Sequence, residues 1–282
     1  MDQMIDPTKY AEARRLLNED SYEEAGALIA ELVRDFEEQY PDIQVNSETD
    51  AYFSFTSPLE QLVYRRADDD DRNLINVADP VDSLYAMHSF VLMTKEEVDA
   101  AREALATAIR WNPVKCAYRY NLAEIYLKNG DPKEYLGLTY SCFARAMTRE
   151  DLEHAFLNFV PFFAQSDQVE TAAAALYAAE KVGAPRGRRF QMAEALLAEN
   201  GGTELYDQMT DERMELLLEE QGLPQGASAE VVVALLVMEE REREKGNRLL
   251  AADYHSMAVA LVGAPAVAVL QDALDDTNTE EG

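Results

Sequence analysis

The side chains best suited to catalysis are three histidines, His88, His154 and His255. They are isolated in the sequence, and the chain contains no HExxH motif, no GxSxG motif and no glycine-rich loop that would hold a phosphate. His88 and His255 fall on or near apolar helix faces, where packing is a commoner role than catalysis. The sequence therefore predicts no catalytic residue, and the alternative that stays open is an enzyme site assembled between distant segments.

Metal and cofactor ligands have no clear motif either. Cys116 and Cys142 lack the CxxC spacing of metal sites, and both fall in apolar helical surroundings where a reduced thiol packs as a small hydrophobic group. The four consecutive aspartates at 68–71 lack the alternating ligands and the glycine of a calcium loop, and we interpret them as a solvated loop. We predict neither a metal nor a cofactor.

One dense basic patch is formed by Arg186, Arg188 and Arg189, which precede a helical stretch containing Phe190 and Met192. Arginines beside a helix N-terminus are able to hold an anion. The alternative, which we favour, is that they pair with the protein's own carboxylates.

The composition excludes several classes of partner. The chain has 282 residues, 48% of them hydrophobic, with 25 Lys and Arg against 54 Asp and Glu, which gives a net charge of -29. Such a chain folds around a sizeable core, and its charge argues against binding to nucleic acid or to anionic membranes. The start of the chain does not resemble a signal peptide, and the longest apolar run, residues 231–238, is far shorter than the roughly 20 residues that span a membrane. We therefore expect a cytoplasmic protein.

The elements that carry these residues are predicted to be helices in pairs. Ala101, Leu105 and Ala108 lie on one helical stripe that ends before Pro113, and the next helix carries Leu122, Ala123 and Tyr126 before Gly130. Equivalent positions, Ala101, Tyr135 and Ala172, follow one another after 34 and 37 residues. The pattern resembles the tetratricopeptide repeat, a helix-turn-helix of about 34 residues. The resemblance implies an all-α, right-handed superhelix, a solenoid of antiparallel helix pairs.

The pattern varies along the chain. The tetrapeptide VGAP occurs at 182–185 and again at 262–265, where Gly followed by Pro is typical of a helix end. We predict five segments: an N-terminal repeat-like helix pair (1–41), an insertion (42–79), central repeats (80–185), divergent helical repeats with a cap (186–274) and an acidic tail (275–282). The insertion is expected to contain a short helix near residues 58–66.

The resemblance also implies a binding groove lined by the first helices of successive pairs. The groove candidates would be Met87, Phe90, Tyr120, Asn121, Glu124, Lys128, Asn158 and Gln165. Aromatic and Met side chains would serve as apolar anchors, and Asn and Lys would hold a peptide backbone or carboxylate. We expect a non-enzymatic scaffold or adaptor that binds a protein or peptide. The alternatives are a regulator that changes shape on binding a peptide, and the enzyme mentioned above.

Overall fold

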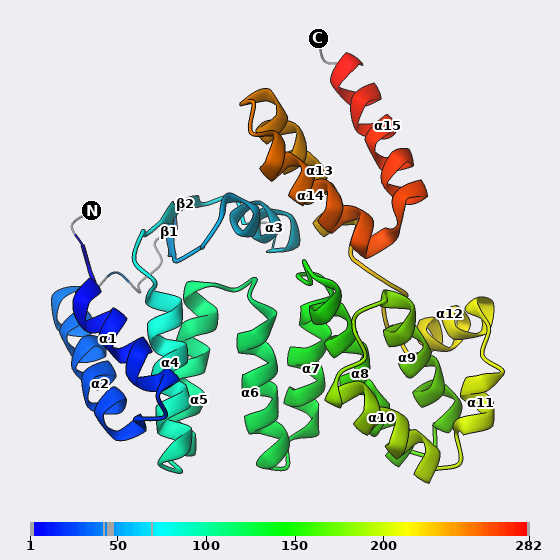
Figure 1. The fold of residues 1–282 in the computed structure, drawn as a ribbon, viewed down its shortest axis with the longest axis horizontal. Helices are drawn as coiled ribbons and strands as arrows, with labels where there is room; N and C mark the ends of the chain where they lie inside the picture. Colours follow the sequence, from blue (N-terminus) through cyan, green and yellow to red (C-terminus); the bar gives the residue numbers. More distant parts are fainter. Residues whose placement is uncertain (1–2, 42, 44–47, 69, 281–282) are drawn as a thin grey trace. The chain divides into compact units, whose positions relative to one another are not determined.

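The computed structural model describes residues 3–41, 43, 48–68 and 70–280. This part of the chain is mostly helical, with fifteen helices and one small parallel sheet of two strands (Figure 1). The chain divides into two compact units, Met1–Tyr135 and Leu136–Gly282. The prediction of an all-α fold is confirmed only in part, because the chain is mostly helical but also contains this sheet.

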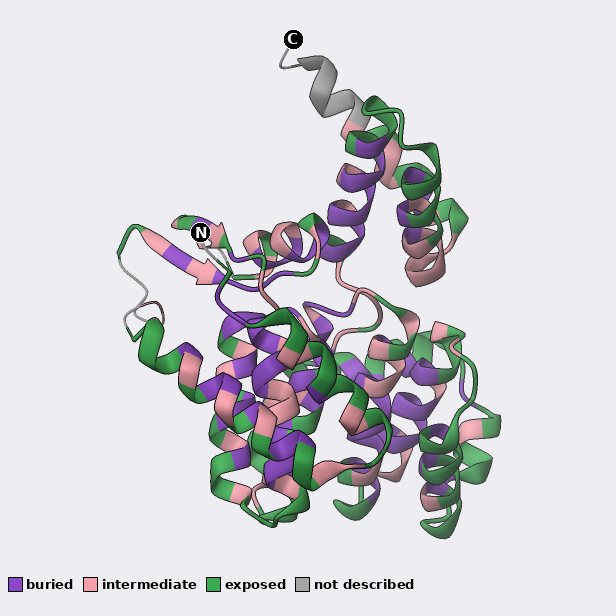
Figure 2. Ribbon diagram, turned by 60° about the vertical axis from the view of Figure 1, so that its left-hand side comes forward, coloured by how far each residue is buried: buried purple, intermediate pink, exposed green. Residues whose placement is uncertain are grey.

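The first unit consists of helices that pack in chain order. Contacts join α1 to α2, α2 to α4, α4 to α5 and α5 to α6. The predicted stripe Ala101, Leu105 and Ala108 is buried, as are Ala25, Ile29 and Leu32 of the first pair. Figure 2 shows buried and exposed residues alternating along these helices, as expected for amphipathic elements. The helices are α1 (Pro7–Asn18), α2 (Tyr22–Gln39), α4 (Val81–Thr94), α5 (Val98–Trp111), α6 (Cys116–Lys128) and α7 (Pro132–Phe143), the last of which crosses the boundary between the units.

The second unit is built around the pair α8 and α9. Aromatic residues of α8, including Phe156 and Phe163, are buried, and α9, which packs against α8, contributes the small buried residues 172–175. The helices are α8 (Arg149–Gln165), α9 (Val169–Val182), α10 (Arg188–Glu199), α11 (Thr203–Asp207), α12 (Asp211–Glu220), α13 (Ala229–Glu244), α14 (Arg248–Val262) and α15 (Ala264–Glu280). Helix α15 continues into the predicted tail, of which residues 281–282 lie outside the described part of the chain.

In several successive pairs, the same kind of turn joins the first helix of the pair to the second. In each turn one residue adopts a left-handed conformation, and the amide of the next residue donates to the carbonyl five positions earlier, as in Glu97 to Leu92 and Asp131 to Tyr126. This arrangement satisfies carbonyl groups at a helix C-terminus. The left-handed residues Glu96, Gly130, Asp167 and Gly201 follow one another after 34, 37 and 34 residues. The same turn also occurs at Asp20, Gly222 and Gly246, where the spacing differs. The structure therefore contains helix pairs that follow one another along the chain.

The segment predicted as an insertion folds as a β-α-β unit. Strand β1 (Asp50–Phe53) pairs in parallel with β2 (Asn73–Asn76), with Ala51 opposite Leu74, and α3 (Pro58–Asp68) lies between them in the chain. The helix is confirmed, whereas the strands were not predicted, because each has four residues and its partner is more than twenty residues away. Phe53, Phe55 and Tyr64 form an aromatic cluster in this unit.

No single helix among the described residues is long and apolar enough to cross a membrane. By length and composition alone, α14 and the first part of α15 meet the criterion together, but they are bent by 119° at the break between them.

Candidate functional site

The candidates on α4 and α6, in the first unit, differ in accessibility. Phe90 is 49% exposed and packs edge-on against Tyr22, with ring centroids 5.5 Å apart. Met87 is half-buried, and Asn121, Glu124 and Lys128 are exposed on α6. Tyr120 is only 3% exposed, so its side chain belongs to the packing between helices. Five of the six candidates on these two helices therefore keep accessible surface.

Asn158 and Gln165 belong to α8 of the second unit. Asn158 is 6% exposed, and its Nδ2 donates to Thr139 Oγ1 at 3.2 Å. Gln165 is exposed as the last residue of α8. Asn158 thus connects two helices, while Gln165 is accessible to a ligand.

The predicted basic patch lies at the start of α10. Arg186 forms an ion pair with Glu180, and its guanidinium carbon lies 4.7 Å from the centre of the Phe190 ring. Arg188 and Arg189 are exposed. The pairing of Arg186 with a carboxylate of the chain fits the predicted alternative to anion binding.

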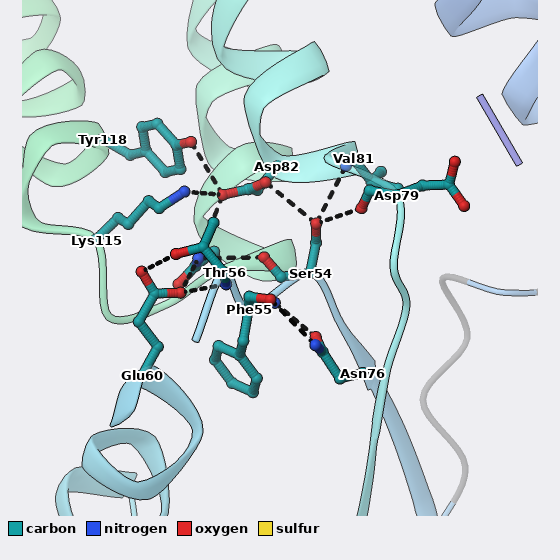
Figure 3. A network of polar contacts seen from close by, with 11 residues as sticks. Ser54, Phe55, Thr56, Glu60, Asn76, Asp79, Val81, Asp82, Lys115 and Tyr118 are labelled. Carbon is teal, nitrogen blue, oxygen red and sulfur yellow. Dashed lines mark hydrogen bonds and ion pairs between the residues drawn. The ribbon is translucent and has the colours of Figure 1, made fainter. Parts of the chain in front are cut away.

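A buried polar network in the first unit has no counterpart among the predicted sites. Its centre is Asp82, in the first turn of α4 and fully buried (Figure 3). Asp82 Oδ2 accepts hydrogen bonds from Lys115 Nζ at 2.6 Å, Tyr118 OH at 3.0 Å and Asn112 Nδ2 at 3.2 Å. Its Oδ1 lies 3.1 Å from the hydroxyl of Ser54. These donors compensate for the removal of the carboxylate from water.

The same network reaches the β-α-β unit through Glu60. Glu60 Oε2 accepts from Asn112 Nδ2 at 2.8 Å and from the Thr56 amide at 2.7 Å. Asn112 Nδ2 also lies 3.2 Å from Ser54 O, and the Ser54 amide donates to Trp111 O at 2.8 Å. Asn112 is fully buried and thereby joins the β-α-β unit to the end of α5 and the start of α4.

The electrostatics of this network favour a fixed arrangement over proton transfer. Burial, and then the neighbouring Asp82 carboxylate, raise the pKa of Tyr118 above its usual value of 10, so the phenol stays a hydrogen-bond donor. The Lys115 ammonium compensates for the charge of Asp82 and lies 5.5 Å from the centre of the Tyr118 ring. We conclude that the network anchors the β-α-β unit. The residues involved are far apart in the sequence and belong to no motif, so spacing gave no signal for them.

The three histidines lie in separate places. Burial lowers the pKa of His88, and burial together with Arg189 lowers that of His154 to about 3. His255 Nδ1 lies 3.0 Å from Glu239 Oε2, and Gln271 Nε2 donates to the same oxygen at 3.1 Å. Glu239 is 4% exposed and lines a cleft of about 470 Å³ between α13 and α15, whereas His255 does not line it. The buried glutamate thus ties α13 to α14 and α15.

The described residues offer no group of three or more His, Cys, Asp or Glu side chains that could hold a metal ion. Cys116 and Cys142 are buried thiols, in agreement with the predicted packing role. A scan against models of protein families and a search of curated proteins found no match to this chain.

Proposed function

We propose that this protein is a divergent member of the tetratricopeptide-repeat class and that it binds a protein or peptide segment without catalysing a reaction. The recurring turns at intervals of 34, 37 and 34 residues support the repeat assignment. Chain-order contacts from α1 to α6, with α3 left out, and the pair α8 and α9 agree with it.

The proposed binding function rests on the side chains of α4 and α6 that stay accessible, which we call the accessible set. Both helices bury much of their surface, yet Met87, Phe90, Asn121, Glu124 and Lys128 stay accessible. A partner that covered the 49% exposed Phe90 ring would remove apolar surface from water. Together these side chains offer an adaptable apolar anchor, an aromatic anchor and groups that hydrogen bond to a peptide backbone.

A peptide array tests this proposal. The full chain is applied to arrayed peptides, and the affinity of selected peptides is then measured by fluorescence anisotropy. We expect Phe90→Ala and Lys128→Ala to weaken binding by roughly 10-fold each, because anchor residues commonly contribute more than 1 kcal/mol.

The control is Leu249→Ala, which removes an 86% exposed apolar side chain from α14 of the second unit. It should leave peptide affinity unchanged. Unchanged affinity in both Phe90→Ala and Lys128→Ala would reject the assignment of the binding surface to α4 and α6.

A further inference from the structure

A cavity of about 420 Å³ in the second unit brings together the two copies of the VGAP tetrapeptide. It is formed by the start of α8, the end of α9, the end of α14 and residues 225–226. Gly183 follows α9 and Gly263 follows α14, and both line the cavity with positive φ angles. Because neither glycine carries a side chain, the backbone at these two helix ends forms part of the wall.

The charge of this cavity is opposite to that of the protein. The net charge of the chain is -29, yet the charged side chains that line the cavity among the described residues are Arg149 and Lys181. Lys181 is paired with Asp211 at 2.7 Å, and Asp211 does not belong to the lining. The positive charge that remains in the lining is therefore that of the Arg149 guanidinium, which attracts an anion.

Arg149 is held in a defined position. Its Nε donates to the carbonyl of Ala260 in the last turn of α14 at 2.6 Å. Its Nη1 lies beside Gly183, 3.8 Å from the position that a Cβ atom would take there. Within the described part of the chain the Nη nitrogens have no protein partner, so the outer edge of the guanidinium is available to a ligand. Such an edge matches the two oxygens of a carboxylate.

Part of the remaining wall is aliphatic. Leu152 of α8, Ala178 of α9, and Val259 and Leu261 of α14 all line the cavity. Small-molecule sites typically have volumes of about 300–1,000 Å³ and combine apolar walls with a few fixed polar groups.

We propose that this cavity binds a small aliphatic carboxylate, with Arg149 holding the carboxylate and the aliphatic wall covering the chain. The site lies in the second unit and is separate from the peptide-binding surface proposed for α4 and α6. An experiment that rejects one of the two proposals therefore leaves the other unaffected.

Calorimetric titration of the full chain with octanoate tests the site, with 1-octanol and inorganic phosphate as comparison ligands. We expect saturable binding of octanoate, at least 10-fold weaker binding of the neutral alcohol and no binding of phosphate. Arg149→Gln should weaken octanoate binding by roughly 10- to 100-fold, the cost of losing a charge-assisted hydrogen bond. Arg188→Gln, which removes an exposed arginine outside the cavity, is the matched control and should bind like the wild type.

A second variant separates ligand binding from folding. Gly226 lines the cavity, and a Cβ atom added there meets no atom within 4 Å, so Gly226→Leu should take up part of the cavity without a clash at that position. We expect it to abolish octanoate binding with an unchanged melting temperature. Absence of saturable octanoate binding to the wild type, equal affinity for 1-octanol, or full affinity in both Arg149→Gln and Gly226→Leu would overturn the proposal.

Discussion

Helix α2 approaches α4 closely at Gly26, and this contact provides a sharp test of the packing. A Cβ atom added at Gly26 would lie 2.6 Å from Val91 Cγ1, well inside the distance at which such atoms make ordinary contact. Val91 is 2% exposed and β-branched, so its side chain has little freedom to move away. We therefore expect Gly26→Ala to separate or distort the pair formed by α2 and α4.

The magnitude follows from two opposing effects. Overpacking of a buried contact costs about 1–3 kcal/mol. Replacing a helical glycine by alanine contributes about 1 kcal/mol in the opposite direction. Gly26→Ala alone should therefore lower the free energy of unfolding by up to about 2 kcal/mol, as the difference of these two effects.

A double-mutant cycle with Val91→Ala isolates the steric effect. Val91→Ala removes the atom that the new Cβ would meet, so Gly26→Ala should become neutral or stabilising in that background. The coupling energy should be about 1–3 kcal/mol. Trp111 is the one tryptophan of the chain and is 2% exposed. Its ring centroid lies 5.8 Å from that of Phe36 in α2, so its fluorescence during urea unfolding reports on this unit. Equal effects of Gly26→Ala in both backgrounds would refute the close approach of the two helices.

Two further predictions concern the buried polar groups. Asn112→Ala should destabilise the first unit by about 2–4 kcal/mol, because Glu60 and Asp82 both lose a hydrogen-bond donor, and hydrogen exchange should show lost protection in β1 and β2. The control is Asn121→Ala on the surface of α6, which should change the free energy of unfolding by less than about 0.5 kcal/mol. An equally small change in Asn112→Ala would contradict the anchoring role. Burial lowers the pKa of His154 in the folded protein from 6.5 to about 3, so the unfolded chain binds the proton more tightly. As the pH falls below 6.5, the free energy of unfolding of the wild type should therefore decrease, relative to that of His154→Gln, by about 1.4 kcal/mol per pH unit. Urea unfolding at pH 7 and pH 5 measures this difference, and identical pH dependence in both proteins would contradict it.

The helix pairs could be predicted because their signal is local. Ala101, Leu105 and Ala108 are separated by four and three residues, and this spacing alone places them on one buried face. Pro113 and Gly130 mark helix ends by backbone chemistry that does not depend on the rest of the fold.

The β-α-β unit and its anchor could not be predicted in this way. Each strand is four residues long and is stabilised by a partner remote in the sequence. The network joins Ser54 to Asn112, which are 58 residues apart, through hydrogen bonds that no spacing rule encodes. Asp82 and Lys115 would pass for ordinary surface charges in a chain this rich in charged residues.

The buried side of α6 is a third case in which the sequence pattern was insufficient. Tyr118, Tyr120 and Tyr126 are distributed around the helix, so apolar periodicity does not identify one core-facing side. The structure buries Tyr118 and Tyr120 and exposes Asn121 and Lys128. The accessible set is therefore known only once the neighbouring helices are in place.

Hydrogen exchange of the full chain, with and without a peptide selected on the array, tests the proposed binding function most directly. We predict that a saturating peptide slows amide exchange in α4 and α6, around Phe90 and Lys128, and leaves exchange in α14 unchanged. Protection confined to other helices, or no protection at saturation, would contradict the assignment of this surface as the binding site.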